Sequence, residues 1–343
     1  MATIVLSSPA ALVASLPYLV GFQPHESVVL VWLRAGDILL TQRADAPRSA
    51  RSDWLIALWQ HPAAVVAEEV IVVGVSASPG IRDVVASVIA YAQAQGAQVR
   101  DALIVRETDW ASVMCDEPSC GCSSPRPVPE AIRTAVAAEF AFLGVAPALR
   151  RQDLEAEIAP ESDEGMRKVL VRRGITRPLT ARALERWRDR AIDEALCWQR
   201  TTSGCSELSY ARVISGVQDI RVRDVVLWEL ARVDDASLRA TLPRWQRAVR
   251  LSPESHVAAV ATLASIHAWL LGDGARAVIS LSRAREADAN YSLAHLVDAA
   301  LASGLPPRLW RDALGQMSRQ VCRGGAVRPH SGAVLARHEG AVL

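Results

Sequence analysis

The segment from residue 69 to residue 105 constrains the fold more than any other part of the chain. Residues 69–75 form an almost continuous run of β-branched side chains, which is typical of a strand buried on both faces. Residues 81–95 are apolar at helical spacing and stop at a glycine, and residues 99–105 form a second apolar strand. Such a succession forms a right-handed crossover that places its two strands parallel. The sequence therefore predicts an α/β domain with a parallel strand pair at its centre.

A helix and a β-hairpin are predicted before this unit. Residues 10–19 are apolar at helical spacing; Pro17 should kink or end that helix, and Gly21 suits a left-handed stop. Residues 28–33 and 38–43 are apolar runs on either side of a Gly-Asp turn, which is a hairpin signal. Helices are also expected over residues 52–60 and 130–143, and an edge strand over residues 110–114. These elements predict a mixed β-sheet with flanking helices.

The pattern becomes helical from about residue 149, and helices are predicted over residues 180–198 and 222–233. Farther on, alanines recur at matching places in two successive units, as at Ala248 and Ala284. A repeat of about 34 residues with small residues at helix crossings is typical of tetratricopeptide-like helical hairpins. The predicted division is an α/β domain over residues 1–147, a helical connecting region over 148–236, tetratricopeptide-like hairpins over 237–316 and a disordered tail over 317–343.

The charge balance bears on which partners the chain can take. It has 38 Lys and Arg against 37 Asp and Glu, a formal net charge of +1, whereas a dedicated nucleic-acid-binding protein is normally basic overall. One basic stretch, Arg167–Arg190, follows an acidic run over residues 153–164. We expect a solvated face whose arginines pair with those acids, and contact with phosphate backbones is the alternative. Nucleic acid is therefore not the expected partner.

Hydropathy argues against a membrane segment. The apolar residues 1–21 lack the positive region of a signal peptide, because the first basic residue is Arg34. No uninterrupted apolar run reaches the roughly 18 residues that a membrane span needs. We therefore expect a cytoplasmic protein whose cysteines are reduced.

The corner between the first helix and the first hairpin strand carries the first candidate ligand-binding residues. His25, Glu26 and Ser27 stand there, where polar groups could meet a ligand. Arg43 and Asp45 flank the end of the second hairpin strand and could face the same pocket. The alternative is that the corner only sets chain geometry and that the charged residues form a surface ion pair of little energetic weight.

The turn after the central strand carries the second set, Ser76, Ser78 and Gly80. Ser76 would stand at the carboxyl end of a strand and Gly80 at a helix N-terminus, where anions and nucleotides dock in α/β folds. The local sequence resembles the G-x-S-x-G turn of serine hydrolases, but Ser78 replaces its second glycine. The catalytic motif is incomplete, and a plain capped turn is the alternative to an anion site.

Three cysteines form the candidate metal site. Cys115, Cys120 and Cys122 are spaced C-x4-C-x-C in a proline-bounded loop. Thiolates at such spacing can hold zinc, which prefers four tetrahedral ligands. A fourth ligand would have to come from Asp116, His25 or His61 after folding. Reduced structural cysteines and a redox-sensitive cluster are the other interpretations.

Several stretches resemble one protein family. The most specific is Leu-Pro-Tyr-Leu-x-Gly-Phe-x-Pro-x-Glu-Ser, which runs from Leu16 to Ser27. Similar stretches follow in the expected order at residues 43–47, 103–122, 138–154 and 272–307. Together they resemble a family found widely in actinobacteria and described as a domain of unknown function. The resemblance implies no activity or catalytic residue, and the family tends to have adjacent cysteines where this chain has Cys120-Gly121-Cys122.

The sequence favours an interaction or scaffold protein over an enzyme. Stacked helical hairpins present concave surfaces that bind other proteins, and no complete catalytic motif is visible. The predicted function is therefore protein interaction through the helical repeats, with an α/β domain that binds a ligand or partner. The first alternative is an enzyme or a nucleotide- or anion-binding regulator that uses Ser76–Gly80. The second is nucleic-acid binding through Arg167–Arg190.

Overall fold

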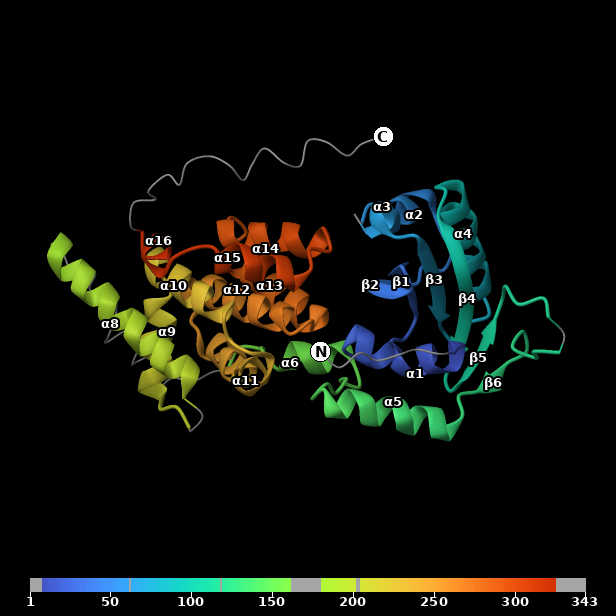
Figure 1. The fold of residues 1–343 in the computed structure, drawn as a ribbon, viewed down its shortest axis with the longest axis horizontal. Helices are drawn as coiled ribbons and strands as arrows, with labels where there is room; N and C mark the ends of the chain where they lie inside the picture. The colour runs from blue at the N-terminus through green and yellow to red at the C-terminus, as the bar shows by residue number, and fades with distance from the viewer. Residues whose placement is uncertain (1–7, 62, 118, 162–179, 202–203, 325–343) are drawn as a thin grey trace. The chain divides into compact units, whose positions relative to one another are not determined.

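The computed structural model describes residues 8–61, 63–117, 119–161, 180–201 and 204–324 (Figure 1). The chain divides into two compact units. The first comprises residues 1–163 and 238–307, and the second comprises residues 164–237 and 308–343. The domain limits predicted at residues 147, 236 and 316 stay predictions.

A mixed six-stranded sheet forms the centre of the N-terminal region, as predicted (Figure 1). Its order is β2-β1-β3-β4-β5-β6. The strands are β1 Ser27–Arg34, β2 Asp37–Asp45, β3 Glu69–Val75, β4 Gln98–Arg106, β5 Asp109–Ser112 and β6 Arg126–Pro127. β3 and β4 are parallel, and the other neighbouring strands pair antiparallel. The predicted hairpin and the predicted parallel pair are both confirmed.

The strand register brings three chain segments to one edge of the sheet. Ser27 at the start of β1 pairs with Val75 at the end of β3, because these strands are antiparallel. Val75 in turn pairs with Val105 near the end of β4. We call this side, where β3 and β4 end and β1 begins, the carboxyl edge. Polar residues that follow β3 and β4 or precede β1 therefore lie near one another.

Helices pack against this sheet, and their apolar side chains form a hydrophobic core with it. They are α1 Pro9–Val20, α2 Ser52–Trp59, α3 Ala63–Val66, α4 Ile81–Ala94 and α5 Glu130–Phe142. On one sheet face, Leu30, Trp32 and Val72 pack with Leu58 of α2 and Val85 of α4. Alternate strand residues therefore bury this face against helices, as expected for β-strand periodicity.

The first helix continues through Pro17 and ends where the sequence predicts. The Ser8 hydroxyl accepts a hydrogen bond from the amide of Ala11 and caps its N-terminus. Gly21 adopts φ +87°, and its amide donates to the carbonyl of Pro17. This left-handed residue stops the helix, as the glycine predicted.

The rest of the described chain is helical, as predicted. The helices are α6 Arg151–Ala156, α8 Ala181–Arg200, α9 Glu207–Gly216, α10 Ile220–Leu230, α11 Asp235–Leu251, α12 Glu254–Leu270, α13 Gly274–Ala287, α14 Ser292–Ala302, α15 Pro307–Gly315 and α16 Arg319–Cys322. In the first unit, α12 packs extensively against α13, and both also contact α14. Arg276 of α13 donates two hydrogen bonds of 2.7 Å to Glu157, just after α6. None of the described helices combines the length and apolar composition needed to cross a bilayer.

Two details of the sequence prediction need correction. The strand near Trp110 is not at the edge of the sheet, because β6 pairs with its outer side. The returning cysteine loop causes this, since the amide of Ser112 donates to the carbonyl of Cys122. Within the tail predicted to be disordered, residues 319–322 form α16, and Cys322 is buried against α8 and α10. Residues 325–343 of that tail lie outside the described residues.

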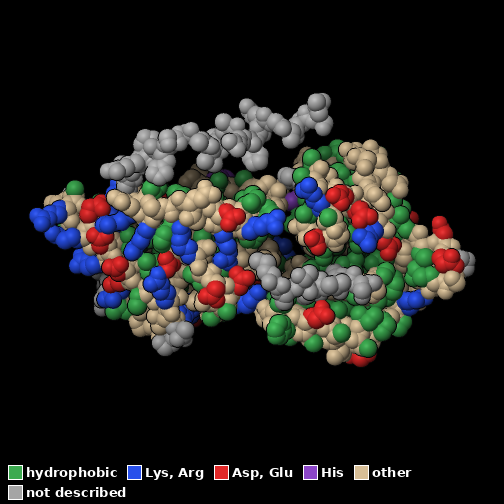
Figure 2. All heavy atoms as spheres, in the orientation of Figure 1, with side chains coloured by type: hydrophobic (Ala, Val, Ile, Leu, Met, Phe, Trp, Pro, Cys, Tyr) green, Lys and Arg blue, Asp and Glu red, His purple; other side chains and the backbone are tan. Residues whose placement is uncertain are grey.

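The acidic run over residues 153–164 does not pair with the basic stretch as expected, among the residues that the structure describes. Its ion pairs are Arg150–Asp153, Arg151–Glu155, Arg276–Glu157 and Arg250–Glu161. In the second unit, buried Arg188 instead forms hydrogen bonds of 2.9–3.1 Å to Asp219, the N-cap of α10. Basic and acidic side chains both appear over α8 (Figure 2). Residues 167–177 of the basic stretch lie outside the described part of the chain.

Candidate functional site

The carboxyl edge brings together residues predicted from two separate motifs. The Ser76 hydroxyl donates a 2.7 Å hydrogen bond to a carboxylate oxygen of Glu26. The same Ser76 oxygen accepts a 2.9 Å hydrogen bond from the amide of Ser78. Glu26 adopts φ +41°, a left-handed conformation that is uncommon for a residue other than glycine. The corner before β1 and the turn after β3 thus form one hydrogen-bonded unit.

Arg43 organises the other side of the corner. Its Nε donates a 2.8 Å hydrogen bond to the fully buried Ser27 hydroxyl, which donates to the carbonyl of His25 at 2.6 Å. Its guanidinium also pairs with Asp45 at 2.6 Å and lies 5.7 Å from the centre of the Phe22 ring. The two hairpin residues and the corner residues are therefore in direct contact, and whether they bind a ligand stays a prediction.

Two carboxylates belong to the surroundings of the Ser76–Gly80 turn. Glu26 places a carboxylate on the Ser76 hydroxyl, and Asp83 stands in the first turn of α4. Gly80 adopts φ −64°, a conformation open to any residue, so its backbone does not require glycine. Both carboxylates oppose a second negative charge at this helix N-terminus.

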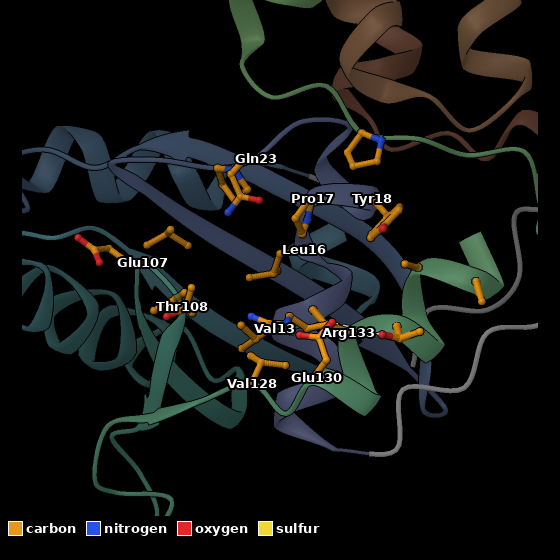
Figure 3. Close-up of a pocket in the computed structure, with 18 of the residues that line it drawn as sticks. Val13, Leu16, Pro17, Tyr18, Gln23, Glu107, Thr108, Val128, Glu130 and Arg133 are labelled. Atoms are coloured by element: carbon orange, nitrogen blue, oxygen red, sulfur yellow. Dashed lines mark hydrogen bonds and ion pairs between the residues drawn. The ribbon is translucent and has the colours of Figure 1, made fainter. Parts of the chain in front are cut away.

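A pocket of about 960 Å³ opens beside the carboxyl edge, between α1 and α5 (Figure 3). Leu16 and Tyr18 line it from α1, and Val75 and Val105 line it from the ends of β3 and β4. Ala138 belongs to its α5 wall. Ligand pockets in α/β folds typically lie at the carboxyl ends of parallel strands. The position of this pocket agrees with that rule.

The pocket has apolar walls and a small number of polar groups. Glu130 and Arg133 point toward one another on α5 and form an ion pair (Figure 3). Hydrogen bonding by Arg133 lowers the pKa of Glu130, so this carboxylate stays ionised and paired. Glu107 also lines the pocket and adopts φ +50°, and no described side chain forms an ion pair with it. The lining therefore carries one uncompensated negative charge.

None of the eight predicted ligand-binding residues lines this pocket. The lining includes Gln23 and Pro24, just before the predicted corner, and Val75, just before Ser76. The α5 wall of the pocket and the Glu107-Thr108 turn after β4 were not predicted from the sequence as part of a site. The available signal was a row of small residues on one side of α5, because small side chains leave space beside a helix. These residues are Thr134, Ala137, Ala138 and Ala141.

The three cysteines of the predicted metal site do converge. The Sγ atoms of Cys115, Cys120 and Cys122 all lie within 4.8 Å of one another. Cys122 is buried, whereas Cys120 is exposed. The loop is fixed to β5 and β6, because the carbonyl of Cys122 accepts the amide of Ser112 and Arg126 donates a 3.0 Å hydrogen bond to the carbonyl of Cys120. This group could hold a metal such as zinc.

Two of the thiols have opposite electrostatic environments. Hydrogen bonding with Cys122 lowers the pKa of Cys120, and the nearby Arg126 contributes to the same shift. Hydrogen bonding with Cys120 and Cys115, together with burial, raises the pKa of Cys122 to about 12. Of these two thiols, Cys120 therefore ionises more readily than Cys122, and it is also the more exposed one.

The predicted fourth ligands lie outside this thiol group within the described residues. Neither Asp116 nor His25 joins the three sulfur atoms. The His61 ring accepts a 3.1 Å hydrogen bond from the amide of Ala63, and it lies against Gly304. The described chain therefore offers three donors and not four.

Comparison with known proteins adds a family and no activity. Comparisons with curated proteins and with solved structures give no match. A family model described as a domain of unknown function, DUF4192, matches residues 9–308. This range contains the whole carboxyl edge, the pocket and the cysteine loop. The chain therefore belongs to the DUF4192 family of unknown function.

Proposed function

We propose that the N-terminal region is a ligand-binding domain and that its site is the pocket between α1, α5 and the carboxyl edge. The observation that carries this proposal is the position of a hollow of about 960 Å³ at the ends of parallel strands β3 and β4. Its volume lies in the range of small-molecule sites, and its lining combines apolar walls with a few polar groups. The adjacent Glu26–Ser76 contact would hold one rim of the site in place.

The charge of the lining indicates the class of ligand. Arg133 is already paired with Glu130, which leaves Glu107 as the uncompensated charge. The walls from Leu16, Val105 and Ala138 are apolar. A small, mostly apolar molecule that is neutral or carries a positive group fits this lining better than a phosphate ester does.

A nucleotide or anion at Ser76–Gly80, and with it an enzyme, is the less favoured function. An anion there would approach the Glu26 carboxylate, and it would have to displace that group from Ser76. Such an exchange is costly, because Glu26 loses the hydrogen bond that it accepts from Ser76 and its carboxylate repels the incoming anion. The prediction stands as an alternative that a binding experiment with nucleotides can test.

A pair of tryptophan variants on one helix tests the pocket. Ala138→Trp would fill the pocket from α5, whereas Ala135→Trp adds the same side chain at an exposed position outside the lining. We expect ligands found in a thermal-shift screen to raise the Tm of the wild type and of Ala135→Trp. They should leave the Tm of Ala138→Trp unchanged. Equal responses of the two variants would exclude this pocket as the site.

We further propose that Cys115, Cys120 and Cys122 hold one zinc ion. The convergence of three sulfur atoms within 4.8 Å supports this, since thiolates are preferred zinc ligands. Bound zinc would fix the loop between β5 and β6. Metal analysis of protein purified without chelators should give one zinc per chain, which Cys120→Ser loses and Cys197→Ser, on α8, retains.

Protein interaction through the helical hairpins remains a proposal, as does a cytoplasmic location.

In the second unit, Arg182, Arg186 and Arg190 lie one turn apart on α8, and all three are exposed. None of them forms an ion pair with another described residue. This spacing supports the nucleic-acid alternative more than the sequence did. Salt-sensitive retention on DNA that is lost when all three become glutamate would establish it.

A further inference from the structure

The cysteine group has one closed side and one open side. Cys122 is buried at the base of the loop, and the amide of Ser112 holds its carbonyl. Cys120 is exposed at the tip, and Cys115 lies between these extremes. A metal ion held by the three sulfur atoms would therefore have protein on one side and solvent on the other.

The acidic side chains of the same loop do not complete a tetrahedral site. The Glu117 carboxylate accepts hydrogen bonds from the amide and hydroxyl of Ser119, at 3.2 and 2.6 Å. Asp116 is exposed and lies outside the sulfur group. Among the described residues, therefore, the donor set stops at three thiols. Zinc sites with three protein ligands keep a fourth position for water or substrate, whereas structural sites are closed by four.

The charge around the group favours a bound thiolate. Three thiolates and one divalent cation sum to a single negative charge, and the Arg126 guanidinium lies beside the loop. An added Cβ at Gly121 would stand only 2.5 Å from its Nη2. Arg126 also lies over the ring of Trp110, which fixes its position. A cation placed there offsets the charge that a fourth thiolate would bring.

We propose that the zinc held by Cys115, Cys120 and Cys122 keeps an exchangeable fourth position whose ligand is a small-molecule thiol. This inference rests on the proposed zinc site. In the exchange, a zinc-bound water leaves and a thiol RSH binds through sulfur as RS⁻, while its proton passes to solvent. The zinc–oxygen bond breaks, the zinc–sulfur bond forms, and no atom is oxidised or reduced. A small-molecule thiolate is a soft sulfur ligand of the same kind as the three cysteine thiolates that would already hold the zinc.

Cobalt substitution of the full-length chain tests the open position. The chain is loaded with Co²⁺, and its absorbance is followed while 2-mercaptoethanol is added without oxygen. We expect tetrahedral cobalt bands before the addition and a saturable rise in sulfur-to-cobalt charge transfer during it. Cys197→Ser should behave like the wild type, because its thiol lies outside the group.

Two negative outcomes have different meanings. Cobalt bands that do not change at saturating thiol would show a closed site and overturn the open position, while the metal site would stand. A thiol response that appears only in Asp116→Asn would likewise overturn it and identify Asp116 as the fourth ligand. Failure of the wild type to bind metal, or equal binding by a folded Cys120→Ser, would refute the zinc site itself. Circular dichroism of each variant separates loss of metal from loss of fold.

Discussion

The hydroxyl of Ser76 donates a 2.7 Å hydrogen bond to the carboxylate of Glu26, a residue fifty positions earlier in the chain. The antiparallel pairing of β1 with β3 makes this contact, because Ser27 pairs with Val75. Glu26 meets Ser76 from a left-handed backbone conformation. The contact therefore ties the motif before β1 to the turn after β3, beside the proposed pocket.

A double-mutant cycle measures the coupling free energy between Ser76 and Glu26. Ser76→Ala should lower the free energy of unfolding by about 1 kcal/mol, since it removes a hydrogen bond at a buried hydroxyl. Glu26→Gln should weaken the same contact, so the double variant should lose less than the sum of the single losses. Urea unfolding gives the three values. Additive losses would mean that the two side chains do not interact in solution.

Much of this edge could be predicted from residue patterns. The β-branched run over residues 69–75 and the helix after it predicted the parallel pair, and that pair determines where β3 and β4 end. The C-x4-C-x-C spacing predicted the group of thiols. In both cases the prediction depends on residues close in the sequence or on a short hydrophobic repeat.

Other features depend on contacts that the sequence does not encode locally. Glu26 and Ser76 meet only through strand register, which a single sequence specifies poorly. Glu107 adopts a positive φ, although a glutamate side chain does not favour this backbone conformation. Arg188 belongs to a charge run that is normally solvated, but Asp219 and tertiary packing bury it. The pocket wall at Ala138 has no signal beyond small size.

Two glycines beside the Ser76 turn should respond differently to alanine. A Cβ at Gly74 would lie 2.6 Å from Val85 and 2.7 Å from Ile81, inside the core beneath α4. Overpacking of this kind costs about 1–3 kcal/mol, so Gly74→Ala should lower the urea midpoint. Gly80→Ala should be nearly neutral, because its nearest neighbour would be 3.6 Å away and its φ is −64°. Equal effects of the two substitutions would contradict the packing described for β3 and α4.

The buried pair Arg188–Asp219 should dominate the stability of the second unit. Burial raises the pKa of Asp219, but the hydrogen bonds from Arg188 and from the amides of Arg221 and Val222, together with the Arg188 charge, outweigh burial and lower the pKa overall. A lowered pKa stabilises the fold above the unfolded value of about 3.9, and this contribution disappears as the pH falls through the folded pKa.

Asp219→Asn leaves the Arg188 charge buried without its main partner, and such losses cost about 3–5 kcal/mol. Asp189→Asn is the control, because its ion pair with Arg323 is half exposed and should contribute less than about 1 kcal/mol. Chemical unfolding monitored by tryptophan fluorescence would compare them, since Trp187 and Trp228 pack against the core of this unit. A stable Asp219→Asn protein would show that the pair is not formed.

His61 should make the first unit less stable in mild acid. Burial lowers its pKa, against the smaller raising effect of the Leu301 backbone. In the unfolded chain, His61 therefore takes up a proton near its ordinary pKa of about 6.5. At that pH the folded chain still keeps His61 neutral. Stability from this group is complete above that pH and is lost as the pH falls toward the folded pKa.

His61→Asn retains an acceptor near the amide of Ala63 and removes the titration. The urea midpoint of this variant should depend less on pH between about 7.5 and about 5.5 than that of the wild type. His256, whose pKa burial also lowers, contributes a slope of the same sign. The double variant with His256→Asn should therefore be flatter still. An unchanged slope in both would contradict the burial of these rings.

A crystallographic fragment screen would show whether the pocket between α1 and α5 binds small molecules, because it locates binding without knowledge of the natural ligand. We predict that neutral or cationic fragments gather in the pocket beside Leu16, Val105 and Ala138, and that Ala138→Trp crystals lose them. Fragments that bind only elsewhere on the first unit and leave this pocket empty would contradict this prediction.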